Sequence, residues 1–142
     1  MKRNVVLAIR GRQTYADQEP EVIELVTEGT MTFRNGGWDI SYEESALTGL
    51  EGVTTTFRVE PGKVTLTRTG KLRSEMVFEE GVPHDTLYQM AFGALMMTVK
   101  ATFVFFDMVE DGGTFLHHPC LQINYFCSTK NYIAMPFVFK LL

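Results

Sequence analysis

The chain has 142 residues, of which 45% are hydrophobic and 21% are charged, and its formal net charge is −4. This composition is that of an ordinary globular domain and excludes a disordered or low-complexity protein. Nucleic-acid binding requires a positive surface, which this charge balance does not supply, so we expect no nucleic-acid partner. We expect a single domain over residues 1–142.

No apolar segment is suited to a membrane span or a signal peptide. The first apolar run, residues 5–9, is followed by Arg10 and Arg12, which end it before a signal-peptide core could form. A strand that carried both Cys120 and Cys127 would hold them roughly 23 Å apart, too far for a disulfide. Free thiols are typical of a reducing compartment, so the sequence predicts a cytoplasmic protein with no membrane partner.

Apolar and polar residues alternate through most of the chain with the period of two that is typical of half-buried strands. In chain order this alternation covers residues 4–10, 23–34, 38–43, 53–60, 64–67 and 72–79. Three more apolar strands are predicted at 96–108, 114–127 and 131–141. No stretch of twelve or more residues has helical periodicity, so we expect an all-β protein.

Short turns join these strands. Residues 35–37 (Asn-Gly-Gly) supply the positive φ values of a tight hairpin, and residues 60–63 (Glu-Pro-Gly-Lys) fit a type II turn. Residues 69–71 and 111–113 mark two more reversals. Parallel crossovers need a dozen or more residues each, so the sheet must be antiparallel. Closure removes exposed sheet edges, and we therefore predict a meander closed into a barrel of eight to ten strands rather than a sandwich.

Several motifs in fixed order resemble a family of bacterial proteins. They are Tyr-Glu-Glu-Ser at 42–45, Thr-Gly-Leu-Glu-Gly at 48–52, Thr-Thr-Thr at 54–56, Thr-Gly-Lys at 69–71, Met-Val-Phe at 76–78 before Gly81, and Tyr88 with Phe92-Gly93. This pattern is similar to that of the YwiB-like family, a domain of unknown function, over about residues 3 to 126. The resemblance implies a lipocalin-like (calycin) barrel. It implies no activity, because none is established for the family.

Two charged residues fall on faces of strands that are otherwise apolar. Glu44 has the parity of Trp38, Ile40 and Tyr42, and Arg68 has the parity of Val64 and Leu66. A charge on an inward face needs water, a partner or a ligand, because unpaired burial costs several kcal/mol. Three interpretations remain open for Glu44 and Arg68: a solvated barrel mouth, a mutual ion pair, and an anion site for a ligand carboxylate.

The remaining polar clusters do not predict chemistry. His117 and His118 are adjacent, so on a strand they point to opposite faces and do not form one metal site, even with Cys120 nearby. We assign His84-Asp85 to a loop, and the glycine-rich residues 49–52 to a bulge or corner, since no phosphate-loop lysine follows them. The sequence therefore predicts no catalytic residue, no metal and no cofactor, and we do not expect an enzyme.

Six of the eight methionines and twelve of the seventeen aromatic residues follow residue 72. They can fill the barrel, line a ligand cavity, or form an oligomer surface. Our first hypothesis is a binding protein for an apolar or amphipathic small molecule, and the alternative is a structural barrel that acts as a homodimer. The predicted ligand contacts are Trp38, Tyr42, Glu44, Arg68, Tyr88 and His117.

Overall fold

The computed structural model describes residues 2–13, 19, 21–90, 93–107, 120–129 and 132–141. These residues form ten strands and one short 3-10 helix. They are β1 (Lys2–Gln13), β2 (Glu21–Arg34), β3 (Gly37–Glu43), η1 (Ala46–Thr48), β4 (Val53–Glu60), β5 (Lys63–Gly70), β6 (Ser74–Glu79), β7 (Pro83–Met90), β8 (Gly93–Asp107), β9 (Cys120–Thr129) and β10 (Tyr132–Leu141).

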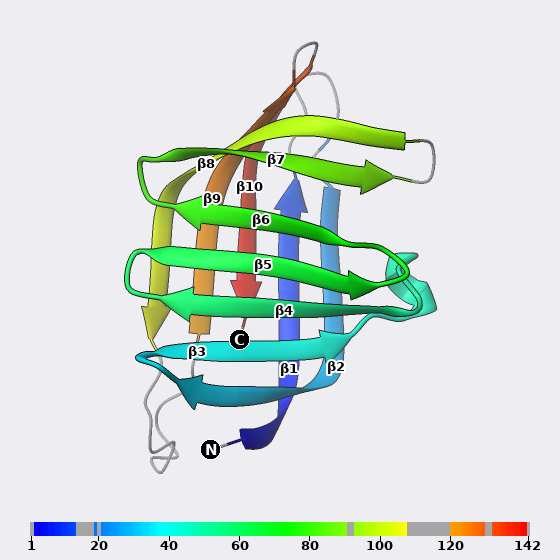
Figure 1. Cartoon of the computed structure of the whole chain (residues 1–142), viewed down its shortest axis with the longest axis vertical. Coiled ribbons are helices and arrows are strands. Elements are labelled where there is room, and N and C mark those ends of the chain that lie inside the picture. The colour runs from blue at the N-terminus through cyan, green and yellow to red at the C-terminus, as the bar shows by residue number, and fades with distance from the viewer. Residues whose placement is uncertain are drawn as a thin grey trace.

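All ten strands belong to one sheet, in the order β6-β5-β4-β3-β2-β1-β10-β9-β8-β7. Every ladder in it is antiparallel. The strands follow chain order along the sheet except at one place, where β1 pairs with β10 (Figure 1). This arrangement confirms the predicted all-β antiparallel meander.

Turn residues have the backbone conformations that their types allow. Asn35 and Gly36 have φ values of 49° and 76°, as the tight β2–β3 hairpin requires. Gly62 follows Pro61 with a φ of 72°, which is consistent with the type II turn predicted between β4 and β5. Gly70 has a φ of 110°, and a Cβ atom there would lie 2.3 Å from the carbonyl oxygen of Gly52. Only glycine therefore fits at the end of β5.

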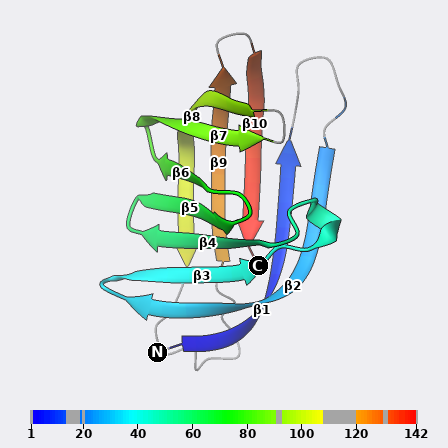
Figure 2. The ribbon, with the colours of Figure 1, turned by 45° about the vertical axis from the view of Figure 1, so that its right-hand side comes forward.

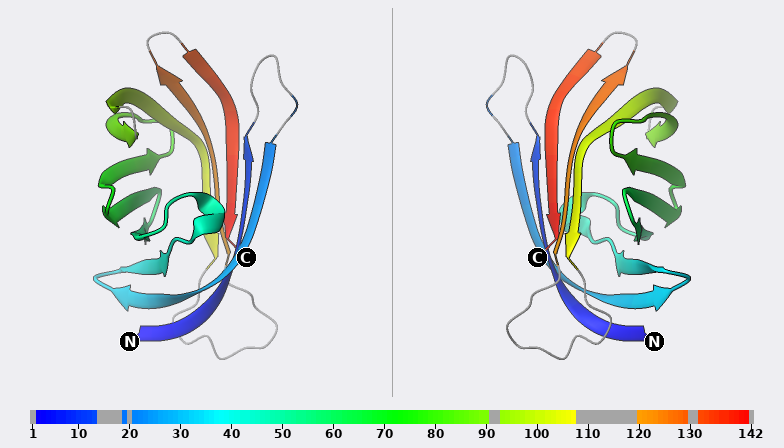
Figure 3. Two further views of the ribbon diagram at one scale, coloured as in Figure 1. Left: turned by 90° about the vertical axis from the view of Figure 1, so that its right-hand side faces the viewer. Right: turned by 90° about the vertical axis from the view of Figure 1, so that its left-hand side faces the viewer.

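The sheet curls so that two of its parts face each other. Strands β3 to β6 form a layer that crosses the layer of β1, β10 and β9, and β2 and β8 bend from one layer to the other (Figures 1 and 2). The side views show these two layers facing each other (Figure 3), and a cluster of buried residues forms the apolar core. Its buried members include Leu7, Ile9, Met31, Trp38, Ile40, Tyr42, Phe57, Val59, Val64, Leu66, Met76, Phe78, Val99, Ala101, Leu121 and Ile123.

The two end strands of the sheet, β6 and β7, meet without a ladder between them in the described residues. Side chains hold this seam instead. Nε2 of His84 lies 2.9 Å from Oε1 of Glu79, and the Thr86 hydroxyl donates to the carbonyl oxygen of Glu75. The backbone adds isolated bridges, Glu79 with Val82 and Glu80 with Ala101. The described backbone hydrogen bonds therefore do not close the sheet into the barrel that we predicted.

Two local predictions were wrong. His84 and Asp85 lie on β7, not in a loop, because Pro83 is the first residue of that strand, where a proline is tolerated. Residues 49–52 are not a bulge within a strand: Gly49 ends η1 with a φ of 75°, and the segment belongs to the connection from β3 to β4. The predicted turn at 111–113 lies outside the described residues.

Both cysteines lie on β9, as the disulfide argument assumed. An extended strand separates residues 120 and 127 by roughly 23 Å, so Cys120 and Cys127 cannot bond to each other.

Candidate functional site

Inward-facing side chains form three rows across strands β2 to β6. Register places Phe33, Trp38, Val59, Val64 and Phe78 in the first row, and Met31, Ile40, Phe57, Leu66 and Met76 in the second. The third row contains Gly29, Tyr42, Thr55, Arg68 and Ser74. The first two rows are apolar, and the third is mostly polar. The core therefore changes from apolar to polar along the length of these strands.

The polar row becomes a cluster because Glu44 joins it from the end of β3. The Thr55 hydroxyl donates to Oε1 of Glu44 across 2.7 Å, and Glu44 is only 8% exposed. The Tyr42 hydroxyl also hydrogen-bonds the Glu44 carboxylate. These donors satisfy a carboxylate that is otherwise costly to bury. We refer to Tyr42, Glu44, Thr55 and Arg68 as the polar cluster.

The environment of Tyr42 shows how closely these groups interact. Burial raises the pKa of the Tyr42 phenol far above its ordinary value, and the nearby charge and hydrogen bond of Glu44 raise this pKa further. The positive charge of Arg68 acts in the opposite direction and lowers it in part. Tyr42 is therefore a neutral hydrogen-bond donor at physiological pH, placed between an acid and a base.

Arg68 has an unusual position in the cluster. It lies opposite Thr55 on β4 and Ser74 on β6, on the inward face that the sequence predicts. Its Nε atom is buried and has no hydrogen-bond partner in the described part of the chain. A buried donor without an acceptor costs about 1–3 kcal/mol. A bound oxygen atom is one way to remove this cost.

A cavity lined in part by Tyr42 and Glu44 of the polar cluster lies where β2 and β3 separate. Their ladder ends at Gly29 and Tyr42, and of the described strands only β1 pairs with β2 from there back to Glu21. The cavity is open, with a volume of about 860 Å³, and its lining includes Glu28, Glu43 and Glu44. Gly29 is required here, because a Cβ atom on it would lie 2.5 Å from the Ser41 carbonyl oxygen and 2.7 Å from Leu7.

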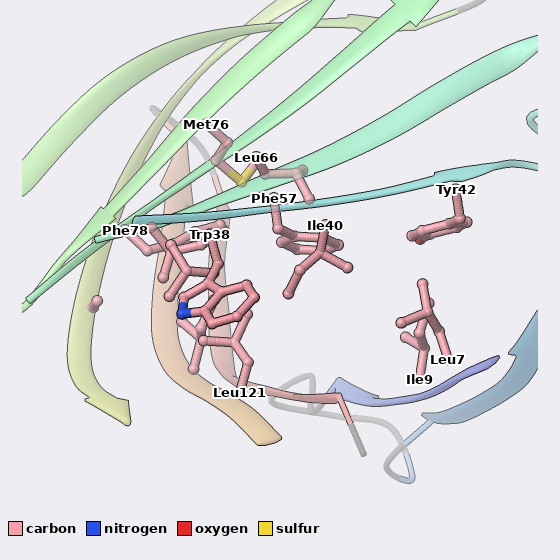
Figure 4. Close-up of a cluster of buried hydrophobic side chains, with 14 of the residues drawn as sticks. Leu7, Ile9, Trp38, Ile40, Tyr42, Phe57, Leu66, Met76, Phe78 and Leu121 are labelled. Carbon is pink, nitrogen blue, oxygen red and sulfur yellow. The ribbon is translucent and has the colours of Figure 1, made fainter. Parts of the chain in front are cut away.

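The structure brings together three of the six predicted ligand residues: Tyr42, Glu44 and Arg68. Trp38 lies four residues before Tyr42 on β3, in the first row, and packs edge-on against Phe33 with ring centroids 5.1 Å apart. Figure 4 shows Trp38 and Tyr42 at opposite ends of the core. The side chain of Tyr88 and the whole of His117 lie outside the described residues, as does the His117-His118 pair.

Thr55 is the member of the cluster that sequence reasoning missed. It stands within the run Thr54-Thr55-Thr56, which looks uniformly polar. Its parity with Val53 and Phe57 was the available signal, since all three residues face inward and are buried.

His84 pairs with Glu79 and not with Asp85, the residue that follows it in the sequence. It contacts Glu79 across the β6–β7 seam, whereas Asp85 accepts a hydrogen bond of 2.7 Å from Thr98. Adjacent residues of a strand point to opposite faces, which explains the separation. The lining of the described cavity contains no histidine, so the His84–Glu79 pair is not joined to it.

Within the described residues, no group of three or more His, Cys, Asp or Glu side chains is placed to hold a metal ion. None of the helices in this part of the chain is long and apolar enough to cross a membrane.

Comparison with known proteins agrees with this fold. The profile of a family described as a domain of unknown function (DUF1934) matches residues 7–135. The chain belongs to this family. The crystal structure of the ywiB protein from Bacillus subtilis is similar, with a TM-score of 0.79 and 22% sequence identity, over 98% of this chain and 91% of that one. No curated protein matches the chain. The resemblance to the YwiB-like family is thus confirmed, and it extends to the fold.

Proposed function

We propose that this protein binds an apolar or amphipathic small molecule, with the polar end of that molecule at the polar cluster. The observation that carries the proposal is the buried Nε of Arg68, which has no acceptor among the described residues and lies beside a hydroxyl-rich inward row. A carboxylate or carbonyl oxygen of a ligand would accept from this donor. Charge-assisted hydrogen bonds of arginine to oxygen are among the strongest in proteins.

The apolar part of the ligand would lie toward the core. Leu7 and Ile9 of β1 are buried across from Tyr42, and they offer an apolar surface next to the cluster (Figure 4). Small-molecule sites commonly combine such surfaces with a few fixed polar groups. Trp38 would serve this site only as distant support of the core, and we retain Tyr88 and His117 as proposed contacts.

This function suits a lipocalin-like (calycin) barrel, the finer fold that we propose for the curled sheet. In that fold the β6–β7 seam completes the wall by side-chain contacts such as His84 with Glu79. We further propose that the protein acts in the cytoplasm, because Cys120 and Cys127 lie on one extended strand and cannot bond to each other.

A second candidate function, a structural barrel that acts as a homodimer, is favoured by an aromatic pair on the outside of β8. Phe103 and Phe105 are 41% and 45% exposed, and their rings stack with centroids 6.3 Å apart. Leu87 and Met96, a cross-strand pair of β7 and β8, are also exposed. Exposed apolar groups of this kind are typical of association surfaces.

Native mass spectrometry of freshly purified protein, followed by titration with decanoate and decanol, tests both functions. We expect a bound small molecule or saturable decanoate binding, at least about tenfold tighter than decanol binding because only the carboxylate is charged. Arg68→Met should remove this difference, whereas Arg73→Met, a matched change of an exposed arginine, should leave it intact. Failure to bind either compound, combined with a dimer that Phe103→Ser dissociates, would favour the homodimer instead.

A further inference from the structure

β2 leaves one edge of the sheet without a neighbouring strand in the part of the chain that the structure describes. β2 pairs with β1 from Glu21 to Thr32, but with β3 only from Gly29 to Arg34. In the described residues no strand therefore pairs with the outer side of residues 21–28. Figure 3 shows β2 at the margin of its layer. Every second residue of this segment directs its N–H and C=O groups to the open side.

This edge has few of the features that prevent strand pairing. Natural edge strands are protected by charged side chains, above all lysines, and by prolines, bulges or short length, and of these the segment has only its glutamates. Residues 21–28 read Glu-Val-Ile-Glu-Leu-Val-Thr-Glu, with neither lysine nor proline, and the β1–β2 register runs through them without a shift. Val26 on its outer face is 72% exposed. The segment is thus long enough, and regular enough, to accept another strand.

The charges near the edge indicate what kind of strand it would accept. Glu24 and Glu28 alternate with Val22 and Val26 on the outer face, and all four side chains are exposed. At the Glu28 end the edge runs into the 860 Å³ cavity, whose lining includes Glu43 and Glu44 but no lysine or arginine. Arg10 contacts Glu24 at 3.4 Å, in a pair that is largely exposed and therefore weak. The charged side chains described on this edge of β2 itself are therefore all acidic.

A second copy of this chain is a poor occupant, because self-pairing would bring two rows of glutamates into one ladder. Like charges that face each other across a ladder are destabilising. We propose that residues 21–28 of β2 bind an extended basic segment of a partner protein by strand addition. The partner's backbone would complete the hydrogen bonding of the edge, and its Lys or Arg side chains would lie over Glu24 and Glu28.

The test uses an eight-residue peptide of alternating lysine and threonine, labelled with fluorescein, and measures anisotropy against the full chain. A peptide of alternating glutamate and threonine controls for charge. A lysine peptide with every backbone nitrogen N-methylated keeps its charge but cannot donate a backbone hydrogen bond along either edge. We expect the lysine peptide to bind at least about tenfold tighter than either control, and to slow hydrogen exchange within residues 21–28.

Variants locate the binding. The double variant Glu24→Lys, Glu28→Lys should bind the lysine peptide at least about tenfold more weakly and the glutamate peptide more tightly than the wild type does. Glu80→Lys, at an exposed position on the β6–β7 connection, should change neither affinity. Equal binding of the N-methylated peptide would overturn strand addition, because only charge would then matter. A dimer that the double variant dissociates would also overturn it, since a second copy would then occupy the edge. Arg68→Met should not affect this assay, which separates this proposal from the small-molecule site.

Discussion

The Thr55 hydroxyl and the Glu44 carboxylate form a hydrogen bond of 2.7 Å inside the protein, between the third residue of β4 and the residue that follows β3. Both side chains are buried, at 0% and 8% exposure. Because a buried carboxylate depends on its donors, this contact links the stability of the fold to the chemistry of the polar cluster.

Replacing Thr55 with valine should test that link. Thr55→Val keeps the shape of the side chain but removes the donor to Glu44, so we expect a loss of about 1–3 kcal/mol in the free energy of unfolding. Urea denaturation measures it. Thr65→Val, on the outer face of β5, serves as the matched control and should cost less than about 0.5 kcal/mol. Equal losses in the two variants would contradict the role of Thr55.

The electrostatic coupling of Glu44 and Arg68 can be measured by a double-mutant cycle of Glu44→Gln and Arg68→Met. Glu44 is buried and Arg68 is half-buried, so their coupling energy should lie between those of surface and buried pairs, at about 1–3 kcal/mol. We expect the double variant to lose less than the sum of the single variants, because removing both charges leaves none uncompensated. A coupling energy near zero would show that water, not the partner, solvates each charge.

The raised pKa of Tyr42 predicts the behaviour of the protein in alkali. Below pH 10 the folded and unfolded states both keep the phenolic proton, so this group does not change stability with pH. Above about pH 10 the unfolded chain loses the proton while the folded protein retains it, and the free energy of unfolding should fall as pH rises.

Tyr42→Phe removes this proton, so its stability should fall less steeply than that of the wild type between pH 10 and about pH 11.5. The difference should approach one proton, or about 1.4 kcal/mol per pH unit. Denaturant unfolding at several pH values measures both slopes. Parallel slopes would mean that Tyr42 ionises as readily in the folded protein as in the unfolded chain.

We expect Arg58, on the outer face of the sheet, to contribute strongly to the stability of the fold. Its guanidinium donates to the carbonyl oxygens of Arg34 and Asn35 at 2.7 and 3.3 Å, and to Asp39 at 3.3 Å. The side chain is only 19% exposed, so Arg58→Met should cost about 1–3 kcal/mol. Arg10→Met, which breaks an exposed pair with Glu24, should cost less than about 1 kcal/mol. Thermal unfolding compares the two variants.

Much of this fold could be predicted because each signal was local. Alternation with a period of two placed Trp38, Ile40 and Tyr42 inward, and the same parity correctly placed Glu44 and Arg68 beside them. The hairpin turns could also be predicted from their glycines, because a positive φ value is a property of a single residue. These features depend on neighbours in sequence.

Features that depend on distant residues could not be predicted in this way. The β6–β7 seam rests on contacts such as Thr86 with Glu75, which no periodicity specifies. β7 itself was missed because Pro83 and the polar pair after it suggested a loop. The point at which β3 leaves β2 follows from the curling of the whole sheet, so the open edge at 21–28 had no sequence signal.

The pairing of β1 with β10, which are far apart in the sequence, has a consequence for biosynthesis. Its register joins Ile9 to Leu141 and Gln13 to Phe137, so this edge of β1 stays without its partner until the ribosome has made β10. At typical translation rates this delay is on the order of ten seconds. During that time β1 to β6 can pair with one another as local hairpins. The unpaired edge of β1 is meanwhile accessible to chaperones or to other chains.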